Sequence, residues 1–302
     1  MEKRQIGSST LQASVIGLGC MSLKPENEKK NEAIIEKAIE LGVNYFDTAD
    51  LYDFGANEEV VGRALKRRRG DIILATKGGN RWNDDKSTWR WDPSKVYIKE
   101  AVKASLMRLG TDYIDLYQLH GGTAEDQMDE TIQAFNELVQ EGVIRYYGIS
   151  SIRPNVIRYY AEHSGIVCVM MQYSLLDRRP EELFPLLSAK KISVISRGSV
   201  AKGMLSEKLW DMDDEKTFLG YRAGYVKECM KGALKEIGPA KLNELALRFV
   251  LNEKTVACAA AGASSIEQLE QNASAGSMQL LKEETLAVLT ALFPAQKYDE
   301  HR

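Results

Sequence analysis

Four ionisable side chains stand at or just beyond the ends of three short apolar segments. Asp47 ends residues 43–47, whose valine, tyrosine and phenylalanine are typical of a buried strand, and Tyr52 follows five residues later. Lys77 ends residues 71–77, and His120 ends residues 113–120. A carboxylate at the tip of a buried strand is costly unless it is paired. The four residues are therefore candidates for one polar site.

These residue types favour proton exchange with a carbonyl oxygen. A phenol titrates near ~10 in water, and a neighbouring ammonium lowers that pKa by favouring the phenolate. Tyr52 beside Lys77 is then a candidate general acid, with Asp47 holding Lys77 and His120 orienting the oxygen. Carbonyl reduction also needs a hydride, which a cofactor must supply. A rival that uses Lys77 as a Schiff-base nucleophile in a lyase or isomerase stays open.

Other chemistries are disfavoured by what the motifs lack. The sequence has no GxSxG nucleophile elbow, and only one histidine stands at a strand end, with no cysteine beside it, so no metal site is expected. The formal net charge of −3 gives no indication of a basic surface that would bind nucleic acid or a membrane. Four scattered cysteines and the absence of a long apolar run predict a reduced, cytoplasmic protein. The oligomeric state is open, and a monomer is compatible with the sequence.

The elements that carry these residues alternate between strand and helix. Three times a helical segment is followed by a glycine and then a strand, at Gly42, Gly110 and Gly142. Such alternation predicts a parallel sheet, and about eight repeats favour a closed (β/α)8 TIM barrel of the α/β class, in which catalytic groups lie at the carboxyl ends of the strands. We expect one domain over residues 1–302, with an N-terminal β-hairpin over 4–15, an irregular stretch over 200–238 and an extra C-terminal helix over 282–292. The expected strands are residues 15–20, 43–47, 71–77, 113–120, 143–149, 166–171, 192–196 and 256–260.

These segments together resemble the aldo-keto reductase superfamily, over about residues 4–275. The likeness rests on Gly17-Leu18-Gly19, Phe46-Asp47-Thr48-Ala49 with Tyr52, Ala75-Thr76-Lys77, Asp112-Tyr113-Ile114-Asp115-Leu116 with His120, Gly148-Ile149-Ser150, and Gly262-Ala263-Ser264 with Asn272. The resemblance implies an NAD(P)H-dependent oxidoreductase acting on CH–OH groups, which reduces aldehydes or ketones to alcohols by direct hydride transfer. Tyr52 would be the general acid, tuned by Lys77 and Asp47, and His120 would orient a small-molecule carbonyl substrate. A low-turnover nucleotide-binding regulatory protein of the same fold remains the alternative.

The resemblance also implies where the cofactor lies. The nicotinamide ribose and carboxamide would lie near Cys20, Met21, Asp47, Ser150, Ser151, Gln172 and Arg197. The pyrophosphate would lie along the loop formed by Gly198, Ser199, Val200, Ala201 and Gly203. The adenosine would lie near Gly262, Ser264, Gln268, Gln271 and Asn272.

Several positions depart from the pattern of this family. Many relatives have asparagine at Ser151, and an aromatic residue often stands at Arg197, where a guanidinium could stack instead. Relatives usually carry a lysine or arginine for the 2′-phosphate, but this chain has Gly262, Ser264 and Gln268 in that segment. The family favours NADPH, and use of NADH stays open.

Aromatic residues follow Lys77 and predict part of the substrate pocket. Trp82 is the expected substrate contact alongside Tyr52 and His120, and Trp89 and Trp91 lie on the same loop. An apolar wall of a pocket and a loop packed on its own aromatic side chains are both open.

Overall fold

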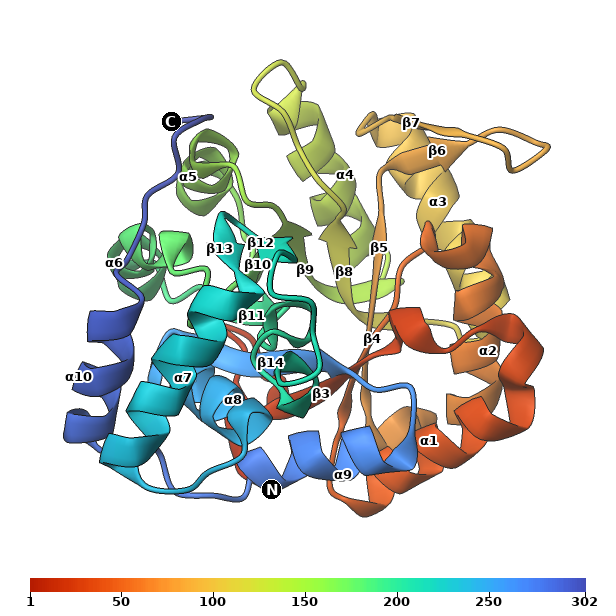
Figure 1. Cartoon of the computed structure of the whole chain (residues 1–302). Helices are drawn as coiled ribbons and strands as arrows, with labels where there is room; N and C mark the ends of the chain where they lie inside the picture. The colour runs from red at the N-terminus through yellow and green to blue at the C-terminus, as the bar shows by residue number, and fades with distance from the viewer.

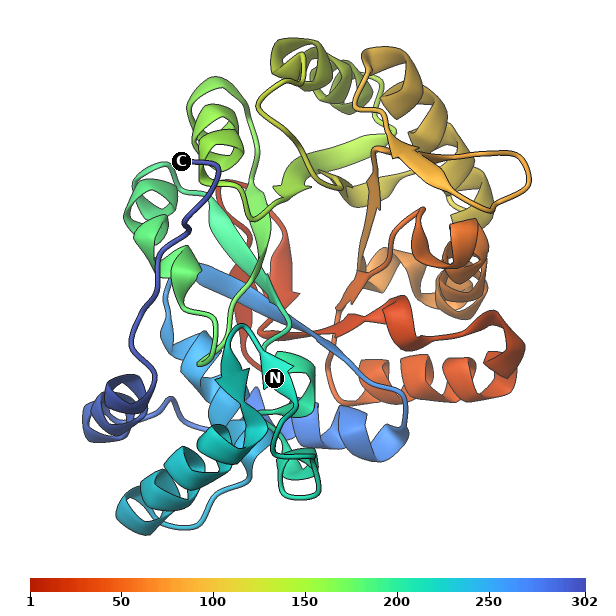
Figure 2. The same ribbon diagram turned by 45° about the horizontal axis from the view of Figure 1, so that its top comes forward.

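Eight parallel strands form a closed barrel in the computed structural model, which describes all 302 residues. Neighbouring strands around the barrel follow the order β10-β11-β14-β3-β4-β5-β8-β9. Figure 2 shows the strands surrounding a central axis with helices outside them. The predicted (β/α)8 fold is confirmed. The strands are β3 (Ile16–Gly19), β4 (Tyr45–Asp47), β5 (Ile73–Gly78), β8 (Ile114–Leu119), β9 (Ile144–Ser150), β10 (Cys168–Gln172), β11 (Ser193–Arg197) and β14 (Val256–Gly262).

One helix follows each barrel strand and covers it on the outside (Figure 1). Helix α3 shows how the sequence sets the bounds, because Ser94 caps its first turn and Gly110 ends it with a φ of 62°. The barrel helices are α1 (Glu28–Glu40), α2 (Ala56–Leu65), α3 (Lys95–Leu109), α4 (Met128–Gln140), α5 (Pro154–His163), α6 (Phe184–Ala189), α8 (Leu242–Asn252) and α9 (Ile266–Ala275).

The hydrophobic core has two parts, as expected for a barrel with helices outside it. A cluster of 68 buried residues lies between the strands and the helices, and a cluster of 14 includes residues from six of the strands and from the N-terminal hairpin. That hairpin, β1 (Lys3–Gln5) and β2 (Gln12–Ser14), contributes Ile6, Leu11 and Ala13 to the smaller cluster. The backbone N–H of Gly7 donates to Ser193 Oγ at the start of β11, so the hairpin covers the end of the barrel opposite the strand tips.

The stretch over residues 200–238 is more regular than we expected from its glycine and charged residues. It contains a short hairpin, β12 (Thr217–Phe218) and β13 (Tyr221–Arg222), and then the 15-residue helix α7 (Ala223–Ile237). Ala223, Val226, Met230 and Ala233 are buried along one face of α7 at the three- and four-residue spacing of an amphipathic helix. The prediction of an irregular segment was therefore wrong over α7.

Two further additions surround the barrel. The expected C-terminal helix is present as α10 (Glu283–Leu292), which contacts α7. The loop after β5 folds into a hairpin of β6 (Asn80–Trp82) and β7 (Trp89–Trp91), which stands above the strand ends in Figure 1. No helix is both long and apolar enough to cross a membrane.

Candidate active site

A buried ion pair joins the ends of β4 and β5. Lys77 Nζ donates to Asp47 Oδ1 at 2.5 Å and to the carbonyl oxygen of Thr48 at 2.7 Å. The Lys77 side chain is completely buried, and 5% of the Asp47 side chain is exposed. Adjacent strands 4 and 5 of a barrel end side by side, so the sequence positions of the two residues place them in contact.

Burial and mutual contact act on both ionisations of this pair. Burial raises the pKa of Asp47, and the contacts with Lys77, Gln118 and Tyr45 only partly oppose this. Burial by itself would lower the pKa of Lys77, but the charge of Asp47 and the hydroxyl of Tyr52 outweigh it, and the pKa is raised. Lys77 is therefore held as an ammonium. That state disfavours the Schiff-base alternative, which requires a neutral amine.

Tyr52 lies on a tight turn directly after this pair. The turn covers Tyr52–Gly55, and Asp53, Phe54 and Gly55 all have positive φ, at 48°, 50° and 89°. Two non-glycine residues in this left-handed region are energetically costly, so neighbouring contacts must hold them there. Lys24 Nζ donates to Asp53 Oδ1 at 2.8 Å, and Phe54 packs edge-on against Trp82. The ammonium nitrogen of Lys77 lies 5.2 Å from the centroid of the Tyr52 ring.

His120 follows β8 and faces Tyr52. The two rings are nearly perpendicular, with centroids 6.0 Å apart. Burial, together with the charges of Lys77 and Arg197, lowers the pKa of His120 to about 3. Its Nδ1 atom is buried and has no hydrogen-bond partner in the protein. His120 is thus a neutral imidazole with hydrogen-bonding capacity that the protein itself does not use.

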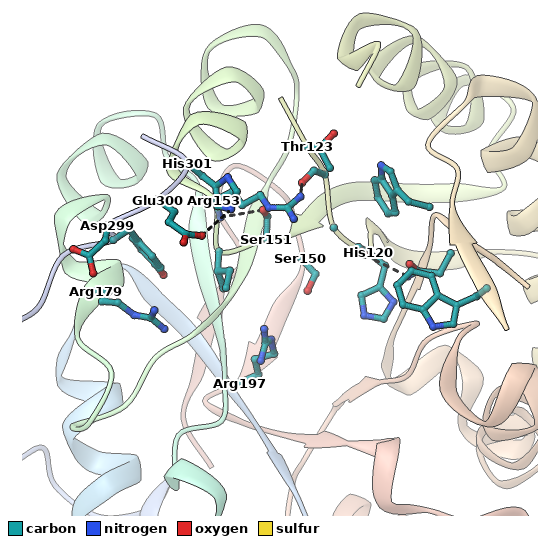
Figure 3. A pocket seen from close by; sticks show the side chains of 17 residues that line it. His120, Thr123, Ser150, Ser151, Arg153, Arg179, Arg197, Asp299, Glu300 and His301 are labelled. Atoms are coloured by element: carbon teal, nitrogen blue, oxygen red, sulfur yellow. Dashed lines mark hydrogen bonds and ion pairs between the residues drawn. The ribbon is translucent and has the colours of Figure 1, made fainter. Parts of the chain in front are cut away.

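A cavity of about 600 Å³ opens beside His120 (Figure 3). It is bounded by the loops after β8, β9 and β10, by the end of β11, by the β6–β7 hairpin and by the end of the chain. Its lining residues are Asn80, Trp89, Trp91, His120, Gly121, Gly122, Thr123, Ser150, Ser151, Ile152, Arg153, Arg179, Arg197, Tyr298, Asp299, Glu300 and His301.

The tryptophans of the hairpin divide between two sides. Trp89 and Trp91 line the cavity beside His120. Trp82, the expected substrate contact, instead packs against Phe54 and lines a smaller hollow of about 270 Å³ that also contains Asp50 and Arg108. The geometry therefore favours Trp89 and Trp91 over Trp82 as the aromatic wall.

The side chains expected to contact the nicotinamide lie at the ends of β9, β10 and β11. Ser150 and Ser151 line the cavity together with Arg197. Gln172 donates to Asp177 Oδ2 at 2.9 Å, and its Oε1 accepts from Arg197 at 3.3 Å, which fixes the orientation of the amide. These residues are close together, as the barrel topology predicts. Cys20 and Met21 lie at the end of β3, where Cys20 is buried and Met21 is 60% exposed.

The loop expected at the pyrophosphate has an open, glycine-containing backbone. Gly198 and Gly203 have φ values of 68° and 95°, which a residue with a side chain rarely adopts. Ser199 is buried and its hydroxyl lies 3.0 Å from that of Ser196, while Ala201 belongs to the core. Val200 is half-buried. Contacts from this loop would therefore come mainly from its backbone N–H groups.

The segment expected at the adenosine is the start of α9. Ser265 caps the helix by accepting from the backbone N–H of Gln268, and Gln268 Oε1 accepts from both the backbone N–H and the hydroxyl of Ser264. Asn272 is buried and donates to the carbonyl oxygen of Gly262 at 3.2 Å, whereas Gln271 is exposed. The helix start favours an anion.

Some residues of the site had no recognisable signal in the sequence. Arg153 and the chain end, with Tyr298 and His301, enter the cavity from distant parts of the chain. Gln118, which donates to Asp47 Oδ2 at 3.3 Å, could have been found because it stands next to Lys77 in the register of β5 and β8.

Comparison with known proteins agrees with this geometry. A sequence model of the aldo/keto reductase family matches residues 15–292. The chain belongs to the aldo/keto reductase family. Within it, the chain is 55% identical over 307 residues to the uncharacterized oxidoreductase YqkF of Bacillus subtilis, and the alignment covers all of both chains. It is 35% identical to the aldo-keto reductase yakc [NADP(+)] of Schizosaccharomyces pombe over 70% of this chain and 64% of the relative.

A solved structure of the family has the same arrangement. The holo form of aldo-keto reductase AKR11C1 from Bacillus halodurans superposes with a TM-score of 0.96 at 54% identity, covering 100% of this chain and 99% of that one. Membership of the aldo/keto reductase family supports oxidoreductase activity with a nicotinamide cofactor and a small-molecule substrate.

Proposed function

We propose that the protein reduces aldehydes or ketones to alcohols with NADPH, acting over residues 1–302 as one barrel unit. The observation that carries the proposal is the buried Lys77–Asp47 pair beside Tyr52, opposite a neutral His120. A bound nicotinamide cofactor supplies the hydride.

The loops at the carboxyl ends of β11 and β14 fit such a cofactor. The positive φ values of Gly198 and Gly203 allow backbone N–H groups to approach a pyrophosphate. The capped start of α9, expected at the adenosine, favours the negative charge of a 2′-phosphate. A Cβ atom added at Gly262 would meet only the carbonyl oxygen of Gly19, at 3.8 Å, so this end of the rim is open. Ser150, Ser151 and Gln172 would hold the carboxamide, and Arg197 would stack on the nicotinamide ring.

Tyr52 gives its hydroxyl proton to the carbonyl oxygen as the alcohol forms. Lys77, kept as an ammonium by Asp47, stabilises the phenolate that remains. His120 remains neutral and donates one hydrogen bond that orients the oxygen. The proton therefore comes from the phenol, and the imidazole serves to position the substrate.

The preference for NADPH rests on the family and on the NADP(+) in the name of the yeast relative. In this chain the adenosine segment offers the hydroxyl of Ser264 and the amide of Gln268, without an arginine or lysine. Binding of a 2′-phosphate would then rest on neutral donors, which are weaker than a bidentate arginine. NADH is the competing cofactor. We expect the difference between the affinities for NADPH and NADH to be smaller than it would be if an arginine bound the 2′-phosphate.

A titration followed by turnover tests the proposal. The quenching of tryptophan fluorescence gives the affinities for NADPH and NADH, and the loss of reduced-nicotinamide absorbance after addition of a reactive aldehyde gives the rate. We expect saturable binding, tighter for NADPH, and formation of one alcohol per nucleotide oxidised. The absence of binding by both nucleotides would refute the proposal.

A further inference from the structure

Arg153 is a guanidinium in the wall of the cavity that has no acidic partner. It follows β9 and precedes Pro154, the first residue of α5. One of its N–H groups donates to the carbonyl oxygen of Gly122, two residues beyond His120, and its side chain forms no ion pair. An arginine has five N–H donors, so several remain free. In Figure 3, Arg153 projects between the loops that carry Ser151 and Thr123.

The other two arginines of the cavity differ in their partners. Arg179 makes two hydrogen bonds to the buried carboxylate of Asp177, at 2.7 and 2.8 Å, which neutralises it. Arg197 has no acidic partner either and donates to the neutral amide of Gln172 at 3.3 Å, but in the proposed function the nicotinamide would cover it. Arg153 is therefore the arginine without an acidic partner that the nicotinamide of the proposed function would leave uncovered.

The cofactor does not account for Arg153. The residues expected at the pyrophosphate and adenosine, from Gly198 to Asn272, follow β11 and β14, and none of them lines this cavity. Arg153 comes from the loop after β9, next to the loop of His120. Arg153 and His120 line the same cavity, in which a substrate would lie.

The carboxylates that line the cavity are more exposed than Arg153. Asp299 and Glu300 are the lining carboxylates, both exposed on the end of the chain, and Glu300 lies 3.6 Å from His301 Nε2. Glu125 is exposed as well, and its pKa is lowered by a backbone hydrogen bond and by Thr123, with a smaller effect from the charge of Arg153. Solvent and salt screen exposed charges, while a half-buried guanidinium keeps its effect inside the cavity.

Trp89 and Trp91 make one side of the cavity aromatic. Trp91 is fixed by a hydrogen bond from its Nε1 to Asp126 Oδ1 at 2.9 Å, and Trp89 is half exposed beside it. Such a wall accepts an apolar or planar body. A planar carboxylate at the far end of that body matches the fork of an arginine.

We infer that the preferred substrate is an aldehyde or ketone that carries a carboxylate, and that Arg153 binds this carboxylate while His120 contacts the carbonyl oxygen. This inference rests on the proposed function and adds the substrate class to it. Arg153 thereby determines specificity and takes no part in proton or hydride transfer.

Two aldehydes of nearly the same shape test the inference. We compare para-carboxybenzaldehyde with its neutral amide, para-formylbenzamide, using wild type, Arg153→Met, Arg153→Lys and Arg90→Met. Arg90 stands between Trp89 and Trp91 in β7, but its side chain is 72% exposed and does not line the cavity. Arg90→Met is therefore the control, because it removes one positive charge, as Arg153→Met does, without changing the cavity wall.

We expect Arg153→Met to lower kcat/KM for the carboxylate by about 10- to 100-fold, mainly through KM, because a charge-assisted hydrogen bond is lost. In Arg153→Met, kcat/KM for the amide should change less than about twofold. For the carboxylate, Arg153→Lys should have an intermediate kcat/KM, and Arg90→Met should have that of wild type. Equal losses for both aldehydes in Arg153→Met would show that Arg153 only holds the loop at Gly122. That result, or an unchanged ratio, would overturn the inference.

Binding separates this inference from the reductase proposal. Benzoate and benzamide are titrated by tryptophan fluorescence, which requires no turnover. We expect wild type to bind benzoate more tightly than benzamide and Arg153→Met to lose this difference. If wild type shows that preference but reduces neither aldehyde, the reductase proposal fails while the anion site stands. If the preference is absent while both aldehydes are reduced, the anion site fails alone.

Discussion

The rings of Tyr52 and His120 lie nearly perpendicular, with their centroids 6.0 Å apart, although they follow different strands of the barrel. Lys77 lies beneath Tyr52 and is itself held by Asp47. The arrangement places a phenol, a cation and a neutral imidazole around one position. That position is where the account puts the carbonyl oxygen.

The first prediction concerns the pH dependence that His120 imposes. Because its pKa falls from 6.5 to about 3 in the folded protein, the imidazole stays neutral during turnover, and kcat/KM should show no inflection near 6.5 from this residue. The unfolded state binds a proton below 6.5 that the folded state does not bind, so stability falls as the pH falls. Between about pH 7 and pH 5, this should cost wild type about 2 kcal/mol more than His120→Gln. Urea unfolding of both proteins at the two pH values measures this, and equal losses would contradict it.

The second prediction concerns the Lys77–Asp47 pair. Lys77→Met removes the ammonium and leaves a buried carboxylate without its cation, so the free energy of unfolding should fall by about 3–5 kcal/mol. Adding Asp47→Asn removes the orphaned charge and should restore most of that stability, while carbonyl reduction stays low in both variants. Urea unfolding and steady-state rates measure the two effects. Additive losses of stability in the double variant would contradict the account of the pair.

The third prediction concerns Asp50, two residues before Tyr52. Both carboxylate oxygens are buried without a partner, and burial, followed by the charge of Glu58, raises the pKa of Asp50 well above its ordinary value. A raised pKa means that the charged carboxylate destabilises the folded state as the pH rises above the unfolded value. Asp50→Asn should therefore increase the free energy of unfolding at neutral pH, on the order of 1 kcal/mol, and should lose this advantage near about pH 4.

A matched control for that prediction is Asp71→Asn, because the side chain of Asp71 is 71% exposed. It should change stability little at either pH. If Asp50→Asn destabilises the protein at neutral pH, the carboxylate is making contacts that stabilise the fold, and the prediction is wrong.

Local patterns predicted the barrel because short apolar runs alternate with helical segments and several of these runs end in a polar residue. Asp47, Lys77 and His120 end apolar runs, and topology then brings neighbouring strand ends together. The same reasoning failed over residues 200–238, where glycine and charged residues obscured the spacing of Val226 and Met230 in α7.

The cavity wall was less predictable because it depends on how distant segments pack. Trp82 and Trp89 are direct partners in one hairpin, yet they line different hollows. His301 reaches the cavity because its carbonyl oxygen accepts from the backbone N–H of Asn155, a contact that spans half the chain. No local pattern encodes such a contact, so the sequence predicted the grouping of the polar strand ends better than the composition of the cavity wall.

The central claim is that Tyr52 is the proton donor of an NADPH-dependent carbonyl reduction. The most direct measurement compares wild type and Tyr52→Phe for NADPH affinity and for the rate of aldehyde reduction at saturating NADPH. The account predicts equal affinities and a rate lower by about 10²- to 10⁴-fold in the variant, because only the acidic hydroxyl has been removed. A Tyr52→Phe protein that reduces the aldehyde at the wild-type rate would contradict the account.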